Sequence, residues 1–299
     1  MSKVHWLALS AVPGIGGVTA RRLADKFGGA AKVFDASVDE LVAVPRITPE
    51  IAAALQDVSF DDLESALDDL SGDGIQVITW EDDEYPANLR QADDAPPVLF
   101  MIGDLSASDE NAIAIIGTRE PSPQSAEFAS ALARELAARG VTIVSGLAAG
   151  IDTAAHQGAL QADGGRTLAV LGSGVRVIHP RENRNLAEAV TEHGVLMSEF
   201  QPNTPPSGPN LMMRDRVISG LSKAVIVVEA GIKSGSMDTA LRARKQGRIV
   251  FAVSGSPGTD DLISSGAEVI DPTNADADQI IARLSEPTGE KSDQLTMWR

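Results

Sequence analysis

The sequence predicts an α/β fold: an extended, doubly wound and mostly parallel sheet preceded by a small all-α unit. Apolar runs such as NAIAIIG (111–117) and KAVIVVEA (223–230) alternate with helical patterns of about 10 to 15 residues, which is typical of a parallel sheet. Before residue 70 there are instead two similar helix–turn–helix patterns. We therefore expect a helical domain at 1–72, a sheet domain at 73–272 and a short polar tail at 273–299.

The helical unit starts with HWLALSAV (5–12), an apolar helical pattern. PGIG (13–16) then predicts a tight turn that leads into a second helix. A weaker copy follows, in which DELVAV (39–44) precedes PRIT (45–48) and another helix. This copy lacks both glycines, and an acidic stretch at 57–72 closes the unit.

The sheet domain is expected to contain two early strands and then an alternating series. The early strands are IQVITW (75–80) and VLFMIG (98–103), separated by a connection rich in Pro and Asp. The later strands are expected at 111–117, 141–146, 166–174, 195–200, 223–230 and 248–255. Helices are expected between them at 125–140, 151–164, 182–194, 210–222 and 236–247. The run at 248–255 is predicted to be the last strand, and the tail to hold a short helix.

Composition excludes several classes of function. The chain has no Cys, which excludes disulfides, thiol catalysis and thiolate metal sites. It has no run of 18 apolar residues, so we expect no membrane span and a cytoplasmic protein. The net charge of −17 argues against a polyanionic partner, but the acidity lies in the flanks. Between Asn111 and Gly255 there are 15 Lys and Arg against 12 Asp and Glu.

Four loops at the predicted carboxyl ends of the strands are rich in Gly, Ser and Thr. They are GTREPS (117–122), SGLAAGID (145–152), GSGVRVIHPREN (172–183) and EAGIKSGS (229–236). Ligands of doubly wound sheets bind at this edge. Glycine lets a backbone approach a ligand, and helix N-termini present unpaired N–H groups to anions. Arg119, Arg176, Arg181 and Lys233 add positive charge, so the sequence predicts a phosphate site here.

Other chemistries are disfavoured by the motifs that are missing. The dinucleotide fingerprint G-x-G-x-x-G does not follow the strand at 111–117, and no G-x-S-x-G nucleophile elbow is present. We interpret His156 as a packing or hydrogen-bonding residue and Asp152 as the N-cap of a helix that begins at Thr153. No motif has metal-ligand spacing, so we expect neither a metal nor a cofactor.

Several long segments together resemble the DNA-processing protein A family, also called DprA or Smf. The matching segments are YPANLRQADDAPPVLFMIGDL (85–105), AIIGTREPS (114–122), SGLAAGIDTAAHQGAL (145–160), LGSGVRVIHPREN (171–183), LMSEFQPNTPP (196–206), RDRVISGLSKAVIVVEAGIKSGSMDTA (214–240) and FAVSGSP (251–257). They occur in the family's order across roughly residues 75–270.

The resemblance implies a Rossmann-like domain that binds single-stranded DNA without catalysing a reaction. It also implies a homodimer that protects incoming DNA and loads a RecA-type recombinase onto it. The setting stays open between DNA uptake in natural transformation, general recombination and phage defence. The residues that the resemblance assigns to phosphate or DNA contact are Gly117, Thr118, Arg119, Ser145, Gly146, Gly150, Gly172, Ser173, Gly174, Arg181, Arg214, Arg216, Lys233, Ser234, Gly235 and Ser236.

Some positions depart from the family's pattern. The family has an arginine where this chain has Met213, and an asparagine where it has Asp215. The loop after FAVSGSP is shorter, and the winged-helix-like C-terminal domain of many members is not expected. PGIG (13–16) resembles a helix-hairpin-helix turn. Two roles of this repeat are equally open: contact with DNA, or packing and dimer contact.

The same loops are compatible with two other functions. One is a sensor that binds a free nucleotide in the same pocket. The other is a nucleotide phosphoribohydrolase of the lysine-decarboxylase-like group, in which P-G-G-x-G-T-x-x-E supplies a catalytic glutamate. The corresponding EAGIKSGSMDTA (229–240) has no Glu in the matching helix turn, which disfavours the enzyme.

Overall fold

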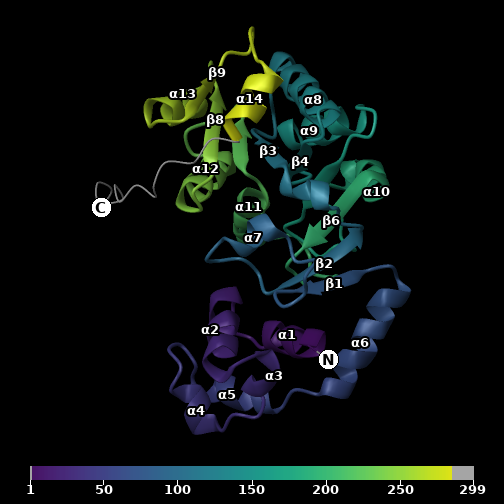
Figure 1. The fold of residues 1–299 in the computed structure, drawn as a ribbon, viewed down its shortest axis with the longest axis vertical. Helices are drawn as coiled ribbons and strands as arrows, with labels where there is room; N and C mark the ends of the chain where they lie inside the picture. Colours follow the sequence, from purple (N-terminus) through teal and green to yellow (C-terminus); the bar gives the residue numbers. More distant parts are fainter. Residues whose placement is uncertain (1, 285–299) are drawn as a thin grey trace.

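The computed structural model describes residues 2–284 and shows a helical unit packed beneath one end of a large sheet (Figure 1). The helical unit contains α1 (Ser2–Ala11), α2 (Gly17–Phe27), α3 (Ala30–Val33), α4 (Val38–Val42), α5 (Pro49–Gln56) and α6 (Phe60–Gly72). The acidic stretch that closes the unit is thus mostly helix α6, and the short α3 was not expected.

The two predicted hairpins have the same backbone form although their sequences differ. Gly14 in the first hairpin has a φ of 91°, and Arg46 at the equivalent place in the second has a φ of 73°. The helix after each hairpin is capped at the equivalent position, by Gly16 for α2 and by Thr48 for α5. The internal repeat is therefore confirmed, and it persists where a glycine has been replaced.

The helical unit shares its hydrophobic core with the first strands of the sheet. Trp6 and Leu9 of α1 belong to one buried cluster with Val77 and Phe100. At the same boundary, the guanidinium of Arg21 lies 4.5 Å from the ring centre of Trp80. The predicted division at residue 72 therefore stays a prediction, because the core crosses it.

Nine strands form one sheet. They are β1 (Gln76–Thr79), β2 (Val98–Gly103), β3 (Ala112–Ile116), β4 (Thr142–Ser145), β5 (Thr167–Val170), β6 (Gly194–Ser198), β7 (Ala224–Val227), β8 (Ile249–Val253) and β9 (Glu268–Ile270). Their order is β1-β2-β6-β5-β4-β3-β7-β8-β9. Strands β3 to β9 pair in parallel, whereas β2 is antiparallel to both of its neighbours. The mostly parallel sheet is confirmed.

Helices cover both faces of the sheet. On one face α8 (Pro123–Ala138), α9 (Ile151–Leu160) and α14 (Ala277–Leu284) share a buried cluster with alternate residues of β3, such as Ile113 and Ile115. On the other face α11 (Gly208–Leu221) and α12 (Gly235–Lys245) pack on Ala112 and Ala114. The remaining helical segments are α7 (Ala87–Arg90), α10 (Arg184–His193), α13 (Pro257–Ser264) and the 3₁₀ turns η1 (Ala107–Glu110) and η2 (Arg181–Asn183).

The prediction that the strand series ends at residue 255 was wrong. Helix α13 and strand β9 follow, and β9 extends the sheet through Val253 paired with Ile270. Strand β9 has only three residues, too few for a periodic pattern to reveal it. The short helix expected in the tail is α14, and the rest of the predicted tail, 285–299, lies outside the described residues.

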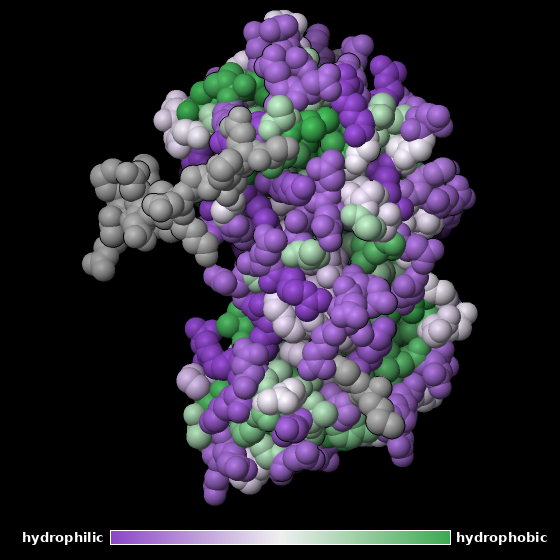
Figure 2. All heavy atoms as spheres, viewed as in Figure 1, coloured by the Kyte–Doolittle hydropathy of each residue, from purple (hydrophilic) through white to green (hydrophobic). Residues whose placement is uncertain are grey.

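The surface in the view of Figure 2 is mostly hydrophilic over both the helical unit and the sheet domain. Within residues 2–284, every helix is too short or too polar to span a bilayer.

The strand order reverses at β3, which lies between β4 and β7. Because β3, β4, β5 and β7 are parallel, the loops that follow them meet at a single edge. Crevices beyond the carboxyl ends of the strands near such a reversal are the usual ligand sites of this architecture. The structure therefore brings the predicted glycine-rich loops together.

Candidate nucleic-acid interface

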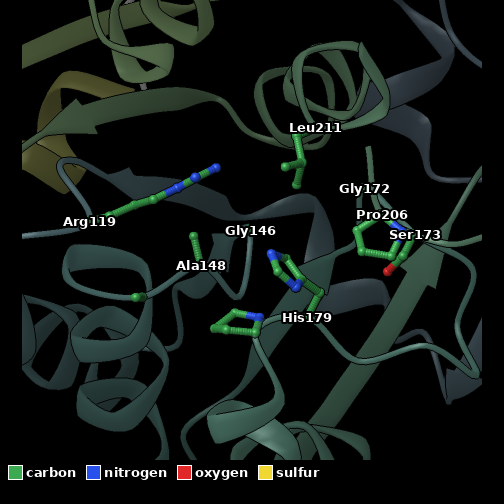
Figure 3. A pocket seen from close by; sticks show the side chains of 10 residues that line it. Arg119, Gly146, Ala148, Gly172, Ser173, His179, Pro206 and Leu211 are labelled. Atoms are coloured by element: carbon green, nitrogen blue, oxygen red, sulfur yellow. The ribbon is translucent and has the colours of Figure 1, made fainter. Parts of the chain in front are cut away.

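A small pocket lies at this edge, above the carboxyl ends of β3, β4 and β5 (Figure 3). It encloses about 70 Å³, far less than the roughly 300–1,000 Å³ of pockets that enclose drug-sized ligands. Its lining residues are Arg119, Gly146, Ala148, Ala149, Gly172, Ser173, His179, Pro180, Pro206 and Leu211. None of them is acidic, although the chain as a whole is strongly acidic.

Arg119 is the cation of this pocket. Its side chain is exposed and extends into the space between the loops, and it makes no hydrogen bond or ion pair within the described part of the chain (Figure 3). The preceding residue is fixed, because the Thr118 N–H donates to the Glu229 carbonyl oxygen over 2.7 Å. The Thr118 hydroxyl oxygen in turn accepts from the Glu120 N–H. A rigid backbone thus presents a guanidinium that is free to bind an anion.

Three backbone N–H groups of the lining have no acceptor among residues 2–284. They belong to Ala149, Gly172 and Ser173, and two of these residues are buried. Buried N–H groups are nearly always paired, so unpaired ones at a pocket wall indicate a missing acceptor. Phosphate oxygens are well suited to such groups, especially beside an arginine.

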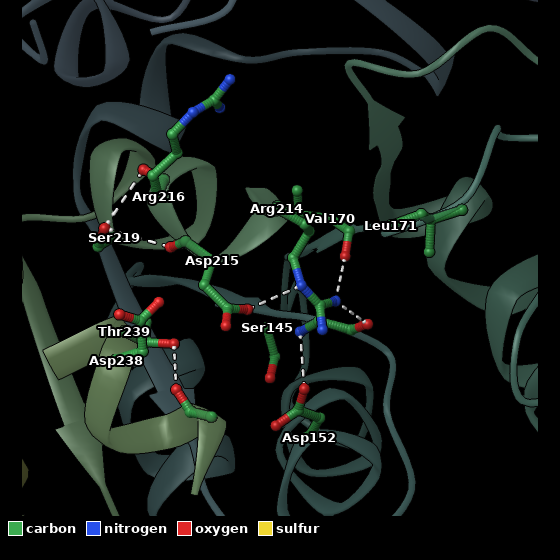
Figure 4. Close-up of polar contacts among 12 residues, drawn as sticks. Ser145, Asp152, Val170, Leu171, Arg214, Asp215, Arg216, Ser219, Asp238 and Thr239 are labelled. Carbon is green, nitrogen blue, oxygen red and sulfur yellow. Dashed lines mark hydrogen bonds and ion pairs between the residues drawn. The ribbon is translucent and has the colours of Figure 1, made fainter. Parts of the chain in front are cut away.

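The loop after β4 is held from below by Asp152. This carboxylate accepts a hydrogen bond from the Gly146 N–H over 3.1 Å (Figure 4). The structure contradicts the interpretation of Asp152 as an N-cap: α9 begins at Ile151 and is capped by Gly150, so Asp152 lies in its first turn. The interpretation of His156 as a packing or hydrogen-bonding residue is confirmed, because it is fully buried and its Nδ1 lies 2.7 Å from the Thr167 hydroxyl.

Arg214 connects α11 to two of the loops (Figure 4). Its Nη1 donates to the carbonyl oxygens of Gly146, over 2.5 Å, and Val170, over 2.7 Å. Its Nε donates to Asp215 over 3.0 Å. The side chain is 6% exposed, so this guanidinium supports the pocket from behind.

Arg216 points away from Arg214 and toward a different partner (Figure 4). Its Nη2 donates to the Glu199 carboxylate over 2.6 Å, and the side chain is 9% exposed. Direct DNA contact by Arg214 and Arg216 therefore stays a prediction. In the structure both act inside the protein, because each is buried and engaged with a carboxylate.

The buried carboxylates around these arginines are perturbed. Burial raises the pKa of Asp152, while Arg214 and the N–H groups of Gly146 and Ala148 oppose the shift. Burial also raises the pKa of Asp215 to about 6, against the opposing effect of Arg214 and with a further rise from Asp152. Burial likewise raises the pKa of Glu199, which Arg216 opposes.

The glycines of these loops allow segments of the protein to approach one another closely. A Cβ on Gly117 would meet Ile151, and one on Gly146 would meet Arg214 at 2.2 Å. On Gly150, whose φ is 81°, it would meet the carbonyl oxygen of Thr118 at 2.4 Å. On Gly174 it would meet the carbonyl oxygens of residues 201 and 202. These glycines allow the loops to pack on one another, and Gly146 also lines the pocket. Their contact with phosphate stays a prediction.

Of the remaining predicted residues, two line the pocket and the others do not. Gly172 and Ser173 line it, but the Ser173 hydroxyl donates to the Val177 carbonyl. The Ser145 hydroxyl donates to the Ile115 carbonyl and is fully buried. The other predicted residues outside the lining are Arg181, Lys233, Ser234, Gly235 and Ser236. Arg181 and Lys233 are exposed and make no ion pair within the described residues, so they can extend a basic surface beyond the pocket.

Sequence reasoning missed several lining residues. His179 and Pro180 lie in the loop at 172–183, where only Gly, Ser and Arg residues are assigned to the phosphate site from the sequence. Pro206 and Leu211 come from the loop after β6 and the start of α11, and neither carries a polar side chain. Residue type alone therefore could not have indicated them.

The family model described as DNA recombination-mediator protein A matches residues 76–285. A second model, described as a SAM-like helix-hairpin-helix tandem, matches residues 7–57. Protein Smf of Synechocystis is 35% identical over 280 residues, which cover 90% of this chain and 70% of that protein.

Two solved structures support the same relationship. DNA processing protein A of Streptococcus pneumoniae superposes with a TM-score of 0.80 at 28% identity, covering 94% of this chain and 98% of that one. A DNA processing protein A of Helicobacter pylori, described for its single-stranded DNA binding mode, gives 0.62 at 32% identity and covers 70% and 95%. Since the family model covers most of the chain and the same fold recurs in these proteins, the chain belongs to the DNA recombination-mediator protein A (DprA/Smf) family.

Proposed function

We propose that this protein binds single-stranded DNA by its phosphates, with the strand crossing the pocket at the edge of the sheet. The free guanidinium of Arg119 beside the unpaired N–H groups of Ala149, Gly172 and Ser173 carries this proposal. Single-stranded DNA binding is the property for which the H. pylori relative is described. Backbone donors and an arginine contact phosphate whatever the base, so we expect little sequence preference.

The small size of the pocket favours a strand over a free nucleotide. A volume of about 70 Å³ can hold a phosphate group, but it is much smaller than sites that enclose a whole small molecule. Between β3 and β7, where the strand order reverses, a hydrogen bond within the protein joins the two loops that follow these strands. There the Glu229 carboxylate accepts from the Ser122 N–H over 2.9 Å.

We further propose that the protein acts by binding rather than by catalysis. Hydrolysis at a ribose needs a carboxylate or an equivalent acid–base group near the reacting atoms. The pocket lining contains no carboxylate, and Asp152 and Asp215, which bond to Gly146 and Arg214, are buried. This arrangement favours a binding protein over the phosphoribohydrolase considered above.

The biological role that we propose follows from the family. The protein would protect incoming single strands in the cytoplasm and load a RecA-type recombinase onto them as a homodimer. A test is to coat oligo-dT with a single-strand binding protein and measure recombinase assembly with and without this chain. We expect faster assembly with the wild type and no acceleration with a variant that cannot bind DNA.

The binding proposal is tested by fluorescence anisotropy with labelled oligo-dT of increasing length. We expect affinity to rise with length, and Arg119→Ala to weaken it by at least about tenfold, as for a lost charge-assisted contact of 1.5–3 kcal/mol. Arg134→Ala is the matched control, since Arg134 is exposed on α8 and makes no ion pair within the described residues. It removes the same charge away from the pocket and should bind as the wild type does.

Two results would contradict the proposal. Equal loss of affinity in the Arg119 and Arg134 variants would indicate general electrostatic attraction without a defined site. Tighter binding of mononucleotides than of long oligonucleotides would favour the nucleotide sensor.

A further inference from the structure

A second pocket lies on the opposite side of the sheet domain from the candidate nucleic-acid interface. It encloses about 290 Å³ and is formed by the segment before α7, the first two residues of α7, the segment between β2 and β3, and single residues of β5 and α11. Its residues Asp109 and Glu110 immediately precede β3, and Leu221 ends the helix before β7. The pocket is therefore near the amino ends of strands whose carboxyl ends carry the DNA site.

The wall of this second pocket is apolar. Leu168 and Leu221 are buried side chains of the core beneath it, and Tyr85 is buried beside them. Leu105 and Pro86 complete the apolar wall. Burial of a ligand's alkyl chain against such a surface removes apolar area from water and therefore favours binding.

The rim of the pocket is negatively charged and lacks a cation. Asp83, Glu84 and Glu110 are exposed and form no ion pair within the described residues. Asp109 is different, because its carboxylate is bound by Arg166 over 2.6 Å. No Lys or Arg lines the pocket, so the three free carboxylates are not neutralised locally.

One buried polar side chain also has an unused acceptor at this pocket. Asn88 is 8% exposed and lines the pocket. Its Nδ2 donates to the carbonyl oxygens of Glu110 and Leu221, each over 2.9 Å, which fixes the orientation of the amide. Its Oδ1 accepts no hydrogen bond within residues 2–284. This oxygen is open to solvent and can accept a hydrogen bond from a donor that comes from outside the chain.

We propose that this pocket binds a lysine or arginine side chain of a partner protein. The alkyl stem would lie on Leu105, Leu168 and Leu221, as long basic side chains do on apolar surfaces. The charged head would donate to Asn88 Oδ1 and face the carboxylates of the rim, where a charge-assisted hydrogen bond is strongest. The site does not depend on the DNA proposal, and its position allows DNA and partner to be bound together.

The test uses the full chain, labelled with ¹⁵N, and titrates it with Nα-acetyl-arginine amide while amide shifts are recorded. We expect saturable shifts in residues 83–88 and 105–110. Nα-acetyl-norleucine amide, which keeps the stem and lacks the charge, should bind at least about tenfold more weakly, as for the loss of one charge-assisted hydrogen bond.

The charge of the rim is tested by a triple variant, Asp83→Asn, Glu84→Gln and Glu110→Gln. It should bind the arginine probe at least about tenfold more weakly than the wild type. The matched control is Glu64→Gln, Asp68→Asn and Asp69→Asn, which removes the same charge from exposed positions of α6. This control should bind the probe as the wild type does, and both triple variants should bind oligo-dT equally well.

Four outcomes would overturn the proposal. They are absence of saturable shifts, equal binding of the norleucine probe, equal weakening by the α6 control, and binding of spermidine without binding of the arginine probe. The last would assign the pocket to a free polyamine. Because oligo-dT binding is measured separately, failure here is distinguishable from failure of the proposed DNA site.

Discussion

The side-chain amide of Asn183 donates a hydrogen bond to the carbonyl oxygen of Leu147 over 2.9 Å. Leu147 is fully buried and has a φ of 58°, a left-handed conformation that is costly for a residue with a side chain. The same Nδ2 lies 2.8 Å from the Thr153 hydroxyl, so Asn183 connects both ends of the loop after β4. The hydrogen bonds from Asn183 hold the loop in this unfavourable conformation. In this conformation Ala148 and Ala149 line the pocket.

Replacing Asn183 should therefore loosen the pocket without touching DNA. We expect Asn183→Ala to lower the free energy of unfolding by about 2–3 kcal/mol, because buried acceptors lose their donor. We also expect weaker oligo-dT binding at a temperature where the variant is folded. Asn185→Ala, on the exposed face of α10, is the control for both measurements. Unchanged DNA affinity in a destabilised Asn183→Ala would show that the loop conformation does not matter for binding.

Arg214 and Arg216 offer a paired test of buried charge. Arg214→Met leaves the carbonyl oxygens of Gly146 and Val170, and the carboxylate of Asp215, without their donor. Arg216→Met leaves the Glu199 carboxylate unpaired at a site away from the pocket. Each substitution should lower the free energy of unfolding, measured in urea, by about 3–5 kcal/mol, as when one partner of a buried ion pair is removed.

DNA binding should separate the two variants. Arg214 supports the loops after β4 and β5, so Arg214→Met should also weaken oligo-dT binding when compared at equal fractions of folded protein. Arg216→Met should bind nearly as the wild type does. The opposite ranking would indicate that Arg216, rather than Arg214, faces the strand when DNA is bound.

The sequence predicts the edge of the sheet where the site lies, and it identifies Arg119. Alternation of apolar strands with helices sets the parallel order, and parallel order brings the ends of β3, β4 and β5 together. Arg119 follows directly on a predicted strand end, so its position needs no further knowledge of packing. The local pattern of residues is therefore sufficient to predict the edge of the sheet and the position of Arg119.

The structure was needed for features that depend on which segments meet. Gly146 is a glycine because Arg214, 68 residues later, occupies the space of its missing side chain. Leu211 lines the pocket because α11 starts beside Gly172. Neither contact leaves a periodic pattern in the sequence, and burial of two arginines contradicts the usual preference of that residue for the surface.

Titration of Asp215 should make stability depend on pH. The pKa of Asp215 in the folded protein, about 6, lies above the ordinary value of 3.8. Its contribution to the free energy of unfolding is therefore fully present below pH 3.8 and is lost as the pH rises through 6. Asp215→Asn cannot ionise. The unfolding free energy of this variant, relative to the wild type, should thus rise between pH 4 and 7 by up to about 3 kcal/mol. A difference that does not change with pH in urea titrations would contradict the raised pKa, and Asp61→Asn on α6 is the control.

His156 should have the opposite dependence. The Thr167 hydroxyl donates to the Ile143 carbonyl, so His156 Nδ1 carries the proton that Thr167 accepts, and Nε2 is buried without a partner. Burial, together with the charge of Arg214, lowers the pKa of His156 from 6.5 to about 3. The contribution of neutral His156 to the free energy of unfolding is fully present above pH 6.5 and is lost as the pH falls toward 3. Below pH 6 this loss should approach about 1.4 kcal/mol per pH unit.

Replacing this histidine should remove that dependence. His156→Gln keeps a side-chain donor and cannot be charged, so its unfolding free energy should fall less steeply below pH 6. His193→Gln, at the exposed end of α10, should retain the slope of the wild type. Equal slopes in all three proteins would show that His156 titrates normally in the folded state.

The salt dependence of DNA binding tests whether Arg119 contacts a phosphate. The chain carries a net charge of −17, so long-range attraction cannot explain tight binding, and local contacts must supply it. Each phosphate neutralised on a single strand contributes about 0.7 to the slope of log affinity against log salt concentration. Arg119→Ala should therefore reduce the magnitude of the slope by about 0.7, whereas Arg134→Ala should leave it unchanged. If Arg119→Ala weakened binding with the slope unaltered, Arg119 would be acting on bases or on loop structure, since neither interaction releases counterions.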